Sequence, residues 1–508
     1  MDEFQNFRMF FKKRIGAISL IILTTLLLYL PKLTNFSYSI DSERMANSPA
    51  EVLNSWIGIG RFGLVFLKRF FLLGIDLNPF FINATAYLLL ATSAILLFYI
   101  IDQNLSIPVF LEMLAILTYV CSPINFEQTN FVLQSTEVLI GYNLLFASFI
   151  VLGMPGHKTS WYRLLISIIL TTFSIAIYPS LIIAAAVLCV ITHHILYMHM
   201  AQNPKNFISW VKPFIQMIVM FIASLISYVL LNKLVLLITN IPYNPYTSNA
   251  SIWGRTNPLD VIRSIKASFV EQFIIGSKPF SFSITTYLCI AAIVVLLLSG
   301  IKRKFISWPV LLSLFLEYLL ALSPLILLGG SIGPIRALTP TIPLVLMAYV
   351  LTILYYLDFK SLRIGAALLV SLMIFSQVKT TSDLEQTDIL NFHSETVLTD
   401  QIMDRINQLN ITQYHKYRVI FVGSRSFDSP LTQNGEVIGH THFDWDNGTP
   451  VGSNQRIHDF LRSKGYRFKE VRPDDYANAV KHAQTSNMKA FPSASGLKVL
   501  GHTIIVKL

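Results

Sequence analysis

Apolar stretches of membrane-spanning length recur throughout residues 1–377 of this 508-residue chain. They predict about eleven transmembrane helices, at residues 15–30, 79–101, 107–123, 138–154, 162–178, 180–197, 213–239, 283–300, 307–328, 340–357 and 363–377. Over the whole chain 53% of residues are apolar and only 13% are charged. We therefore predict a polytopic α-helical membrane protein whose transmembrane domain spans residues 1–377.

Basic residues beside the apolar stretches predict the orientation. The patch Lys12-Lys13-Arg14 precedes the first stretch, and no small-residue cleavage site follows it, which is typical of a retained signal anchor. A cytoplasmic N-terminus puts all the basic clusters on the cytoplasmic side: Lys12–Arg14, Lys158/Arg163, Lys205/Lys212, Lys302–Lys304 and Lys360/Arg363. An odd number of spans then places residues 378–508 outside the cytoplasm.

Residues 378–508 have the composition of a small soluble domain. A buried strand is predicted at 417–423, helices at 399–409 and 455–464, and one or two strands at 497–508. We predict an extracytoplasmic α/β domain. It holds 15 basic and 14 acidic residues, against 24 and 14 in residues 1–377. Because the basic excess lies in the membrane part, it favours anionic lipid or a phosphate-bearing substrate over nucleic acid.

A short acidic cluster follows the first apolar stretch. Asp41 and Glu43 stand two residues apart, so an extended loop would direct both carboxylates to one side, whereas a helix would splay them. At an outer membrane surface a carboxylate can act as general base, taking the proton of an acceptor hydroxyl that attacks a sugar's anomeric carbon. Arg44 can pair with a carboxylate or a donor phosphate. The alternative is that all three are ordinary solvated loop charges.

Three predicted outer loops, 31–78, 240–282 and 329–339, are long or polar enough for chemistry. The first contains an amphipathic stretch at 56–73, which we expect to form a helix in the membrane interface. The second contains a predicted amphipathic helix at 258–275. The third is a glycine-rich turn.

Several outward-facing side chains are candidates for substrate binding. Glu127 can bind sugar hydroxyls, or it can be a lone loop charge. Arg61, Arg255 and Arg336 can stabilise the phosphate of a lipid-linked donor, or each can pair with lipid headgroups or surface charges. Arg336 is favoured because glycines before it let backbone N–H groups approach an anion. The aromatic residues Trp56 and Tyr178 can stack on sugar rings, although interfacial anchoring explains most such residues.

Two acids inside apolar runs, Glu112 and Glu317, favour a rival function. An ionised side chain in the membrane is expensive and faces an interior or a partner. These residues suit the coupling groups of a transporter or flippase of lipid-linked sugars, or they are structural acids. The appended outer domain and the lack of an evident inverted repeat weigh against transport.

Motifs for other chemistries are missing from the sequence. It contains no P-loop, GxGxxG, HExxH or nucleophile elbow. The cysteines lie in or beside apolar runs and have neither disulfide nor zinc spacing. We expect His442, Asp444 and Asp446 to form a polar turn rather than a metal site. No metal and no cofactor are therefore expected.

Short stretches spread over most of the chain carry a family resemblance: Tyr38–Glu43, Trp56–Arg61, Ser122–Glu127, Ile177-Tyr178, Phe443–Gly448 and Asn454–Leu461. Together they resemble the serotype-converting O-antigen glucosyltransferases, the Gtr-type membrane proteins of enteric bacteria and their phages. Pro179 departs from the pattern, since relatives often have Gln after the tyrosine. The role of the short outer hairpin expected at Tyr178-Pro179 therefore stays open.

The resemblance implies a GT-C type glycosyltransferase in the bacterial cytoplasmic (inner) membrane, with an undecaprenyl-phosphate-linked sugar, usually glucose, as donor. Transfer to a surface polysaccharide or its lipid-linked precursor would occur on the outer face, inverting the anomeric centre without a covalent sugar–enzyme intermediate. An essential acid in the first outer loop is also implied, here Asp41 or Glu43. Expected partners are membrane lipid, a polyprenyl-phosphate glucosyl synthase and a small flippase.

Overall fold

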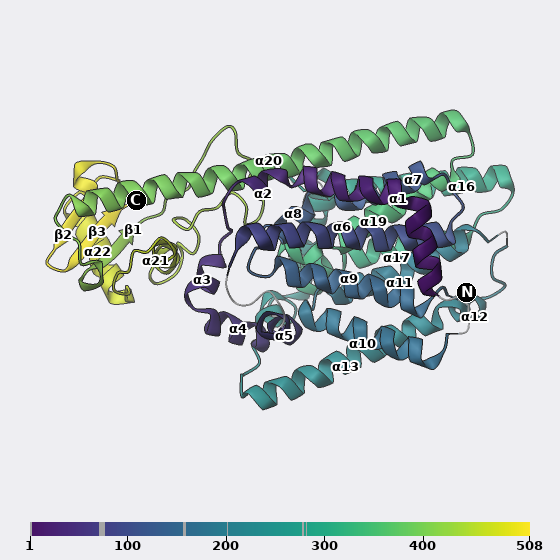
Figure 1. Cartoon of the computed structure of the whole chain (residues 1–508), viewed down its shortest axis with the longest axis horizontal. Coiled ribbons are helices and arrows are strands. Elements are labelled where there is room, and N and C mark those ends of the chain that lie inside the picture. The colour runs from purple at the N-terminus through teal and green to yellow at the C-terminus, as the bar shows by residue number, and fades with distance from the viewer. Residues whose placement is uncertain (1–2, 71–76, 156–158, 201, 277–278, 281) are drawn as a thin grey trace.

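The computed structural model describes residues 3–70, 77–155, 159–200, 202–276, 279–280 and 282–508. Its helices form an elongated bundle, and the C-terminal strands lie at one end of it (Figure 1). The first part of the bundle consists of α1 (Glu3–Leu28), α2 (Leu30–Thr34), α3 (Ser42–Asn47), α4 (Pro49–Gly58), α5 (Phe62–Phe70), α6 (Pro79–Asn104), α7 (Val109–Val120), α8 (Ile124–Thr129), α9 (Ser135–Leu152), α10 (Trp161–Ile177) and α11 (Leu181–Met198).

The chain continues with further helices and a few short helical turns. They are α12 (Phe207–Val211), η1 (Lys212–Phe214), α13 (Ile215–Thr239), α14 (Tyr246–Ala250), α15 (Pro258–Phe269), η2 (Val270–Ile275), α16 (Ser283–Arg303), α17 (Trp308–Ala321), α18 (Ser323–Leu328), η3 (Ile335–Leu338), α19 (Thr341–Tyr356) and α20 (Lys360–Asn407). The C-terminal part holds η4 (Tyr414–Lys416), β1 (Arg418–Val422), α21 (Asn454–Ser463), α22 (Pro473–Thr485), η5 (Ala494–Gly496), β2 (Leu497–Leu500) and β3 (Thr503–Lys507).

Among the described residues, six helical segments are long and apolar enough to cross a membrane. They are α6, α9, α11, α12–α13 (Phe207–Thr239), α16 and α20, and four shorter apolar helices, α7, α10, α17 and α19, accompany them. Helices that are apolar on all sides suit a lipid environment. The predicted polytopic helical protein is therefore confirmed, while the count of about eleven spans stays a prediction.

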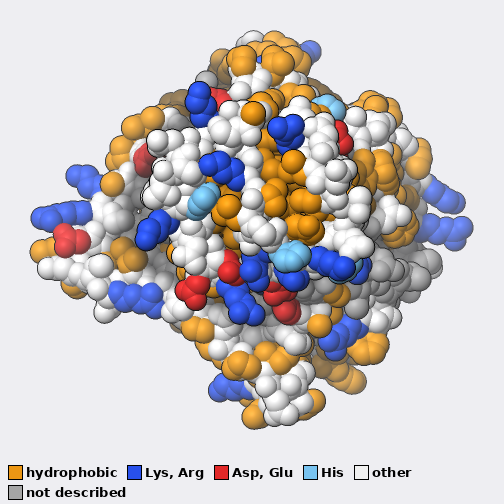
Figure 2. Space-filling model, turned by 90° about the vertical axis from the view of Figure 1, so that its left-hand side faces the viewer, with side chains coloured by type: hydrophobic (Ala, Val, Ile, Leu, Met, Phe, Trp, Pro, Cys, Tyr) orange, Lys and Arg blue, Asp and Glu red, His pale blue; other side chains and the backbone are white. Residues whose placement is uncertain are grey.

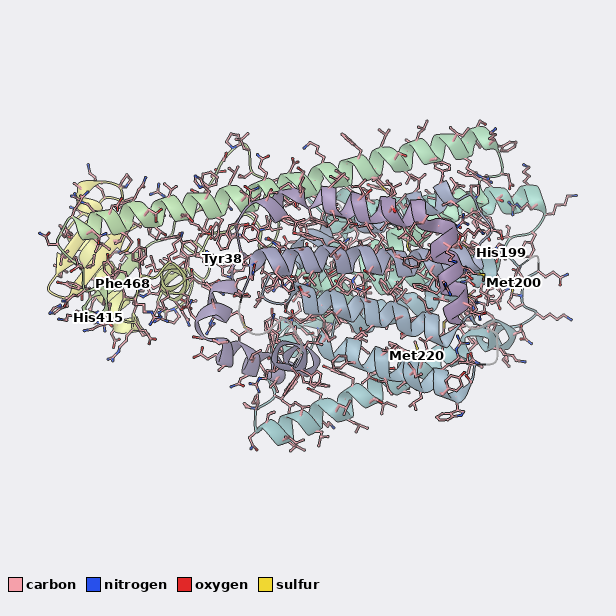
Figure 3. All side chains as sticks on the ribbon, viewed as in Figure 1. Tyr38, His199, Met200, Met220, His415 and Phe468 are labelled. Atoms are coloured by element: carbon pink, nitrogen blue, oxygen red, sulfur yellow. The ribbon has the colours of Figure 1, made fainter. Side chains whose placement is uncertain are left out.

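The two ends of the bundle differ. The N-terminus and α12 lie at one end, and α3, α4 and the strands lie at the other (Figure 1). Figure 3 labels His199 and Met200 at the first end and Tyr38 where the bundle meets the C-terminal part. Seen from the strand end, basic, acidic and histidine side chains mix around an apolar area (Figure 2). Which end faces the cytoplasm stays a prediction from the positive-inside rule.

Helix α20 joins the bundle to the C-terminal part without interruption. The sequence predicted a span at 363–377 and a separate helix at 399–409, but one helix of 48 residues includes the span and the second helix up to residue 407. At 1.5 Å per residue it is about 72 Å long, more than twice the thickness of a hydrocarbon core. It contains no proline and only Gly365, so nothing in it breaks a helix. The predicted domain boundary at 377/378 falls inside it.

The C-terminal strands form a three-stranded sheet of order β1-β3-β2, with β1 parallel and β2 antiparallel to β3. Side chains alternate across β1: Val419 and Phe421 pack toward the end of α20 and α21, while Ile420 and Val422 pack toward α22. The predicted strands at 417–423 and 497–508 and the predicted helix at 455–464 are confirmed.

Three other predicted helical stretches are each built from two consecutive elements. The stretch 56–73 falls in two helices, α4 and α5, and its residues 71–73 lie outside the described ranges. The break lies at Gly60, whose φ of +84° favours glycine. The predicted helix at 258–275 is confirmed, as α15 followed by the π-helical turn η2. The apolar stretch 307–328 divides into α17 and α18, with Pro324 in the first turn of α18.

Candidate active site

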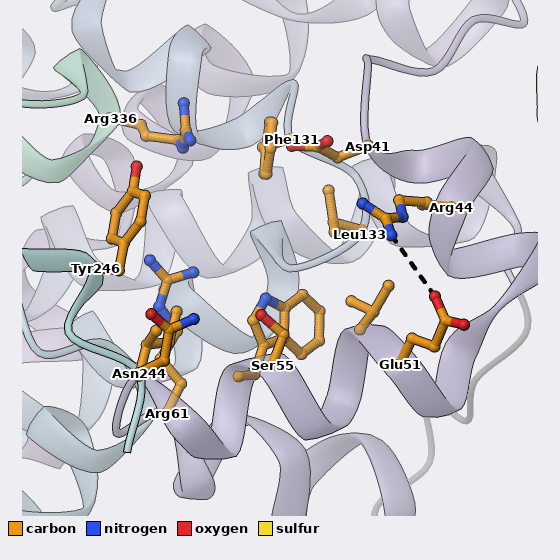
Figure 4. Close-up of a pocket in the computed structure, with 13 residues that line it drawn as sticks. Asp41, Arg44, Glu51, Ser55, Arg61, Phe131, Leu133, Asn244, Tyr246 and Arg336 are labelled. Atoms are coloured by element: carbon orange, nitrogen blue, oxygen red, sulfur yellow. Dashed lines mark ion pairs between the residues drawn. The ribbon is translucent and has the colours of Figure 1, made fainter. Parts of the chain in front are cut away.

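A cavity of about 300 Å³ lies at the strand end of the bundle, beside α3 and α4 (Figure 4). Residues singled out from the sequence line it: Asp41, Arg44, Trp56, Arg61 and Arg336. The remaining lining residues are Glu51, Val52, Ser55, Ile59, Phe131, Leu133, Asn244 and Tyr246. The walls therefore combine carboxylates, guanidinium groups and apolar surface from segments far apart in the chain.

Asp41 presents its carboxylate to this cavity from the N-cap position of α3. Its φ of +76° lies in the left-handed region, which aspartate tolerates better than most residues. The side chain is 36% exposed. Glu51, the other carboxylate of the lining, forms an ion pair with Arg44 at 3.6 Å, drawn as a dashed line in Figure 4.

Glu43 lies behind this wall and is buried, with a fully covered side chain. The extended loop considered for residues 41–43 is wrong, because Glu43 stands in the first turn of α3. The two carboxylates nevertheless meet, since Arg456 contacts both Asp41 and Glu43, the latter at 2.9 Å.

Arg456 comes from α21 in the C-terminal part and was not recognised as a site residue from the sequence. Its guanidinium contacts three carboxylates: Asp41, Glu43 and, at 2.6 Å from Nε, Asp446. Burial acts to lower the pKa of Arg456, but the surrounding carboxylates outweigh it and raise the pKa. A guanidinium fork suits this geometry, since it donates in several directions at once.

His442 is the second unrecognised residue. The expected turn is present at residues 442–448, but the His442 ring is only 1% exposed and lies inside the protein. Its Nδ1 lies 2.9 Å from Glu395 and its Nε2 lies 3.2 Å from Glu43. Burial opposes the charged ring, but these carboxylates raise the pKa of His442 to about 10. His442 and Arg456 in turn outweigh burial and lower the pKa of Glu43.

Two arginines form the cationic wall of the cavity. Arg61 donates to Gln134 Oε1 at 2.8 Å and lies over the ring of buried Tyr178, 4.7 Å from its centroid. Arg336 lies 4.4 Å above the ring centroid of Phe131. Burial and the neighbouring Arg336 lower the pKa of Arg61, although Tyr178 acts the other way. The Tyr178 ring therefore packs against the Arg61 guanidinium and does not line the cavity.

The glycine-rich turn that leads to Arg336 binds the carboxylate of Glu436. The N–H of Ile335 donates to Glu436 at 2.6 Å, and the Arg336 guanidinium lies 3.8 Å from the same carboxylate. The predicted anion contact of this turn is thus made within the chain, by a residue of the C-terminal part. Burial raises the pKa of Glu436, and Arg336 opposes that rise.

Glu127 and Arg255 do not line the cavity. Glu127 was expected to face outward, but it is 2% exposed and accepts the N–H of Glu436 at 2.6 Å. Burial raises the pKa of Glu127 to about 7. The loop was misread because residues 378–508 cover it. Arg255 donates to the backbone and side-chain oxygens of Asn249, at 2.8 and 2.9 Å.

Glu112 and Glu317, the two acids that would suit a transporter or flippase, are both buried in the bundle. Glu317 contacts His194 at 2.8 Å, and that ring reaches Thr352 at 3.2 Å, so one of its oxygens is engaged in a structural network. The carboxylate of Glu112 has no hydrogen-bond partner among the described residues. Within the same residues, no group of His, Cys, Asp and Glu side chains is placed to hold a metal ion.

Comparison with known proteins identifies one family. A family model described as Glucosyl transferase GtrII matches residues 30–357, well over half of the chain. The match includes every lining residue of the cavity but ends before Arg456 and His442. No curated protein and no solved structure gives a significant match.

Proposed function

The chain belongs to the GtrII glucosyl transferase family, and from that premise we propose that it is a GT-C type membrane glycosyltransferase. It transfers a sugar, glucose in our proposal, from undecaprenyl phosphate to a surface polysaccharide or its lipid-linked precursor. One observation carries the proposal: Asp41, Arg61 and Arg336 line the same cavity of about 300 Å³. A general base and two phosphate-binding cations are what such a transfer requires.

Asp41 acts as the general base. The acceptor hydroxyl loses its proton to the carboxylate while its oxygen attacks the anomeric carbon, and the bond from that carbon to the phosphate oxygen breaks. The phosphate departs on its lipid with the bonding electron pair, and Arg61 and Arg336 stabilise its charge. Direct displacement inverts the anomeric centre. The apolar residues of the same lining, among them Ile59 and Leu133, suit the lipid end of the donor.

Glu43 has a different task in this proposal. Because its side chain is fully covered, it does not reach the acceptor, and it instead fixes Arg456 and His442. Arg456 then holds Asp41 at the cavity wall. Arg44 and Trp56 also line the cavity, and in this proposal they contact the sugar.

The transfer takes place on the outer face of the bacterial cytoplasmic membrane. Support comes from the basic connections, which the positive-inside rule assigns to the cytoplasm. The cavity lies at the opposite end of the bundle from the N-terminus, beside the C-terminal domain (Figure 1). A polyprenyl-phosphate glucosyl synthase and a small flippase supply the donor there.

The test uses membranes that contain the full chain, labelled lipid-linked glucose and envelope polysaccharide from a strain that lacks the gene. We expect Asp41→Asn to lose transfer by at least about 100-fold. Asp446→Asn is the matched control, because Asp446 also contacts Arg456 but does not line the cavity. Undiminished transfer by Asp41→Asn would reject the assignment. In the deletion strain, loss of one side-branch sugar supports a transferase, whereas loss of the whole polymer supports a flippase.

A further inference from the structure

A second cavity, of about 390 Å³, lies between α4 and α21. Its size is in the usual range for a small-molecule site. The lining residues are Ser48, Glu51, Val451, Asn454, Gln455, His458, Asp459, Arg462, Glu470 and Val471. Only the two valines are apolar, in contrast to the first cavity with its tryptophan, phenylalanine and leucine. A lipid does not suit these walls, whereas a sugar with many hydroxyls does.

Buried polar groups give this second cavity a preformed wall. His458 is 6% exposed, and its Nε2 donates to the carbonyl of Val419 at 2.8 Å. Burial lowers the pKa of His458 to about 4, so the ring is neutral and Nδ1 is a hydrogen-bond acceptor. No hydrogen bond engages that nitrogen among the residues that the structure describes. Asp459, 5% exposed, contacts Arg462 at 3.3 Å.

The two cavities share a wall. Glu51 of α4 lines both. Helix α3 is joined to α21 by the Asn47 side-chain amide, which donates a hydrogen bond to the carbonyl of Asp459 at 2.9 Å. The same amide also donates to the carbonyl of Glu43, within α3, at 2.7 Å. A chain of sugars that extends from the second cavity past Glu51 therefore enters the first cavity, which Asp41 also lines.

The charges of the second cavity select among polysaccharides. Glu51, Asp459 and Glu470 are acidic, Arg462 is the one cation of the lining, and His458 is neutral. Burial raises the pKa of Asp459 to about 6, so it is mostly ionised at neutral pH. This acidic excess repels an anionic polymer, while carboxylates accept hydrogen bonds from sugar hydroxyls.

We propose that the cavity between α4 and α21 is the acceptor site and that it binds an uncharged segment of the polysaccharide. The proposal rests on the transferase function proposed above and adds to it the place and the charge of the acceptor. The C-terminal part thereby contributes most of the acceptor-binding surface, chiefly through α21.

The experiment measures binding and transfer separately on the purified full chain. Exposed Gln455 is changed to tryptophan to fill the cavity, and Gln484→Trp, on an exposed position of α22, is the control. The probe is the polysaccharide from the deletion strain, with polygalacturonate as an anionic comparison. Binding is measured without donor, and the Michaelis constants for acceptor and for lipid-linked glucose are then measured in turn. Asp459→Asn repeats the test without added bulk.

We expect Gln455→Trp to weaken polysaccharide binding and raise the acceptor KM at least tenfold, with the donor KM within twofold of the parent. Gln484→Trp should match the parent, and polygalacturonate should not bind. Unchanged acceptor binding and KM in both Gln455→Trp and Asp459→Asn would overturn the acceptor site, even if transfer itself is intact. Polysaccharide binding that depends on Gln455 without any transfer would keep the site and reject the transferase.

Discussion

The Arg456 guanidinium on α21 contacts the Asp41 carboxylate at the start of α3, across a sequence separation of 415 residues. The same guanidinium holds Glu43 and Asp446. The C-terminal part of the chain therefore does more than cover the bundle, because it supplies the group that positions the proposed base.

Replacing Arg456 should reduce transfer while leaving the chain folded. We expect Arg456→Gln to lower kcat by about 10- to 100-fold, because Asp41 loses its fixed orientation. Arg456→Lys should recover only part of this, since a single ammonium cannot bridge three carboxylates. Measured kcat, donor KM and melting temperature separate positioning from unfolding. Asp41→Asn/Arg456→Gln should be no slower than Asp41→Asn alone, and additive losses would contradict the coupling.

The charged ring of His442 should make stability depend on alkaline pH. Its pKa is raised from 6.5 to about 10, so its stabilising effect is fully present below pH 6.5 and is lost as pH rises through about 10. We expect the melting temperature to fall between about pH 7 and about pH 10.5 more steeply for the parent than for His442→Gln. Parallel curves for the two proteins would show that the ring is not held as an imidazolium.

Glu436 should compete with the donor phosphate. Its carboxylate takes the N–H of Ile335 and approaches Arg336, both of which suit a phosphate oxygen. We expect Glu436→Gln to lower the KM for lipid-linked glucose by a few fold, whereas exposed Glu470→Gln should leave the donor KM unchanged. A higher donor KM in Glu436→Gln would mean that the carboxylate orients Arg336 instead of competing for it.

Gly60 should be intolerant of a side chain. It has a positive φ, and an added Cβ would meet the hydroxyl of Tyr228, which donates to the carbonyl of Gly60 at 3.1 Å. We expect Gly60→Ala to destabilise the protein by about 1–3 kcal/mol and to displace Arg61 next to it. Gly365→Ala is the control, since nothing lies within 4 Å of its added Cβ. Equal melting temperatures for the two variants would contradict this account.

Much of the fold follows from local patterns in the sequence. The length of the apolar stretches predicted the helices. Alternating apolar and polar residues, bounded by turn residues, predicted β1 and the two C-terminal strands. The continuous helix α20 could also have been predicted, because the segment contains no proline. It was divided in the prediction because the amino-acid composition changes near residue 378. Within the site, five of the cavity's lining residues, Asp41 among them, were identifiable as a charge or an aromatic ring in a predicted outer loop.

The solvent exposure of the acidic side chains and the identity of their binding partners could not be predicted from the sequence. Asp41 and Glu43 look equivalent in the chain, but one lines a cavity and the other is covered. Glu127 looked like an outward-facing charge, yet the turn at Glu436 buries it.

The sequence by itself determined that this chain is a helical membrane protein with an acidic cluster after its first apolar stretch. Both are properties of neighbouring residues. Only the tertiary structure decided which carboxylate reaches the cavity and that His442 and Arg456 surround the other. The physical reason is that burial and charge pairing depend on side chains brought together from distant parts of the chain, and no local pattern records those contacts.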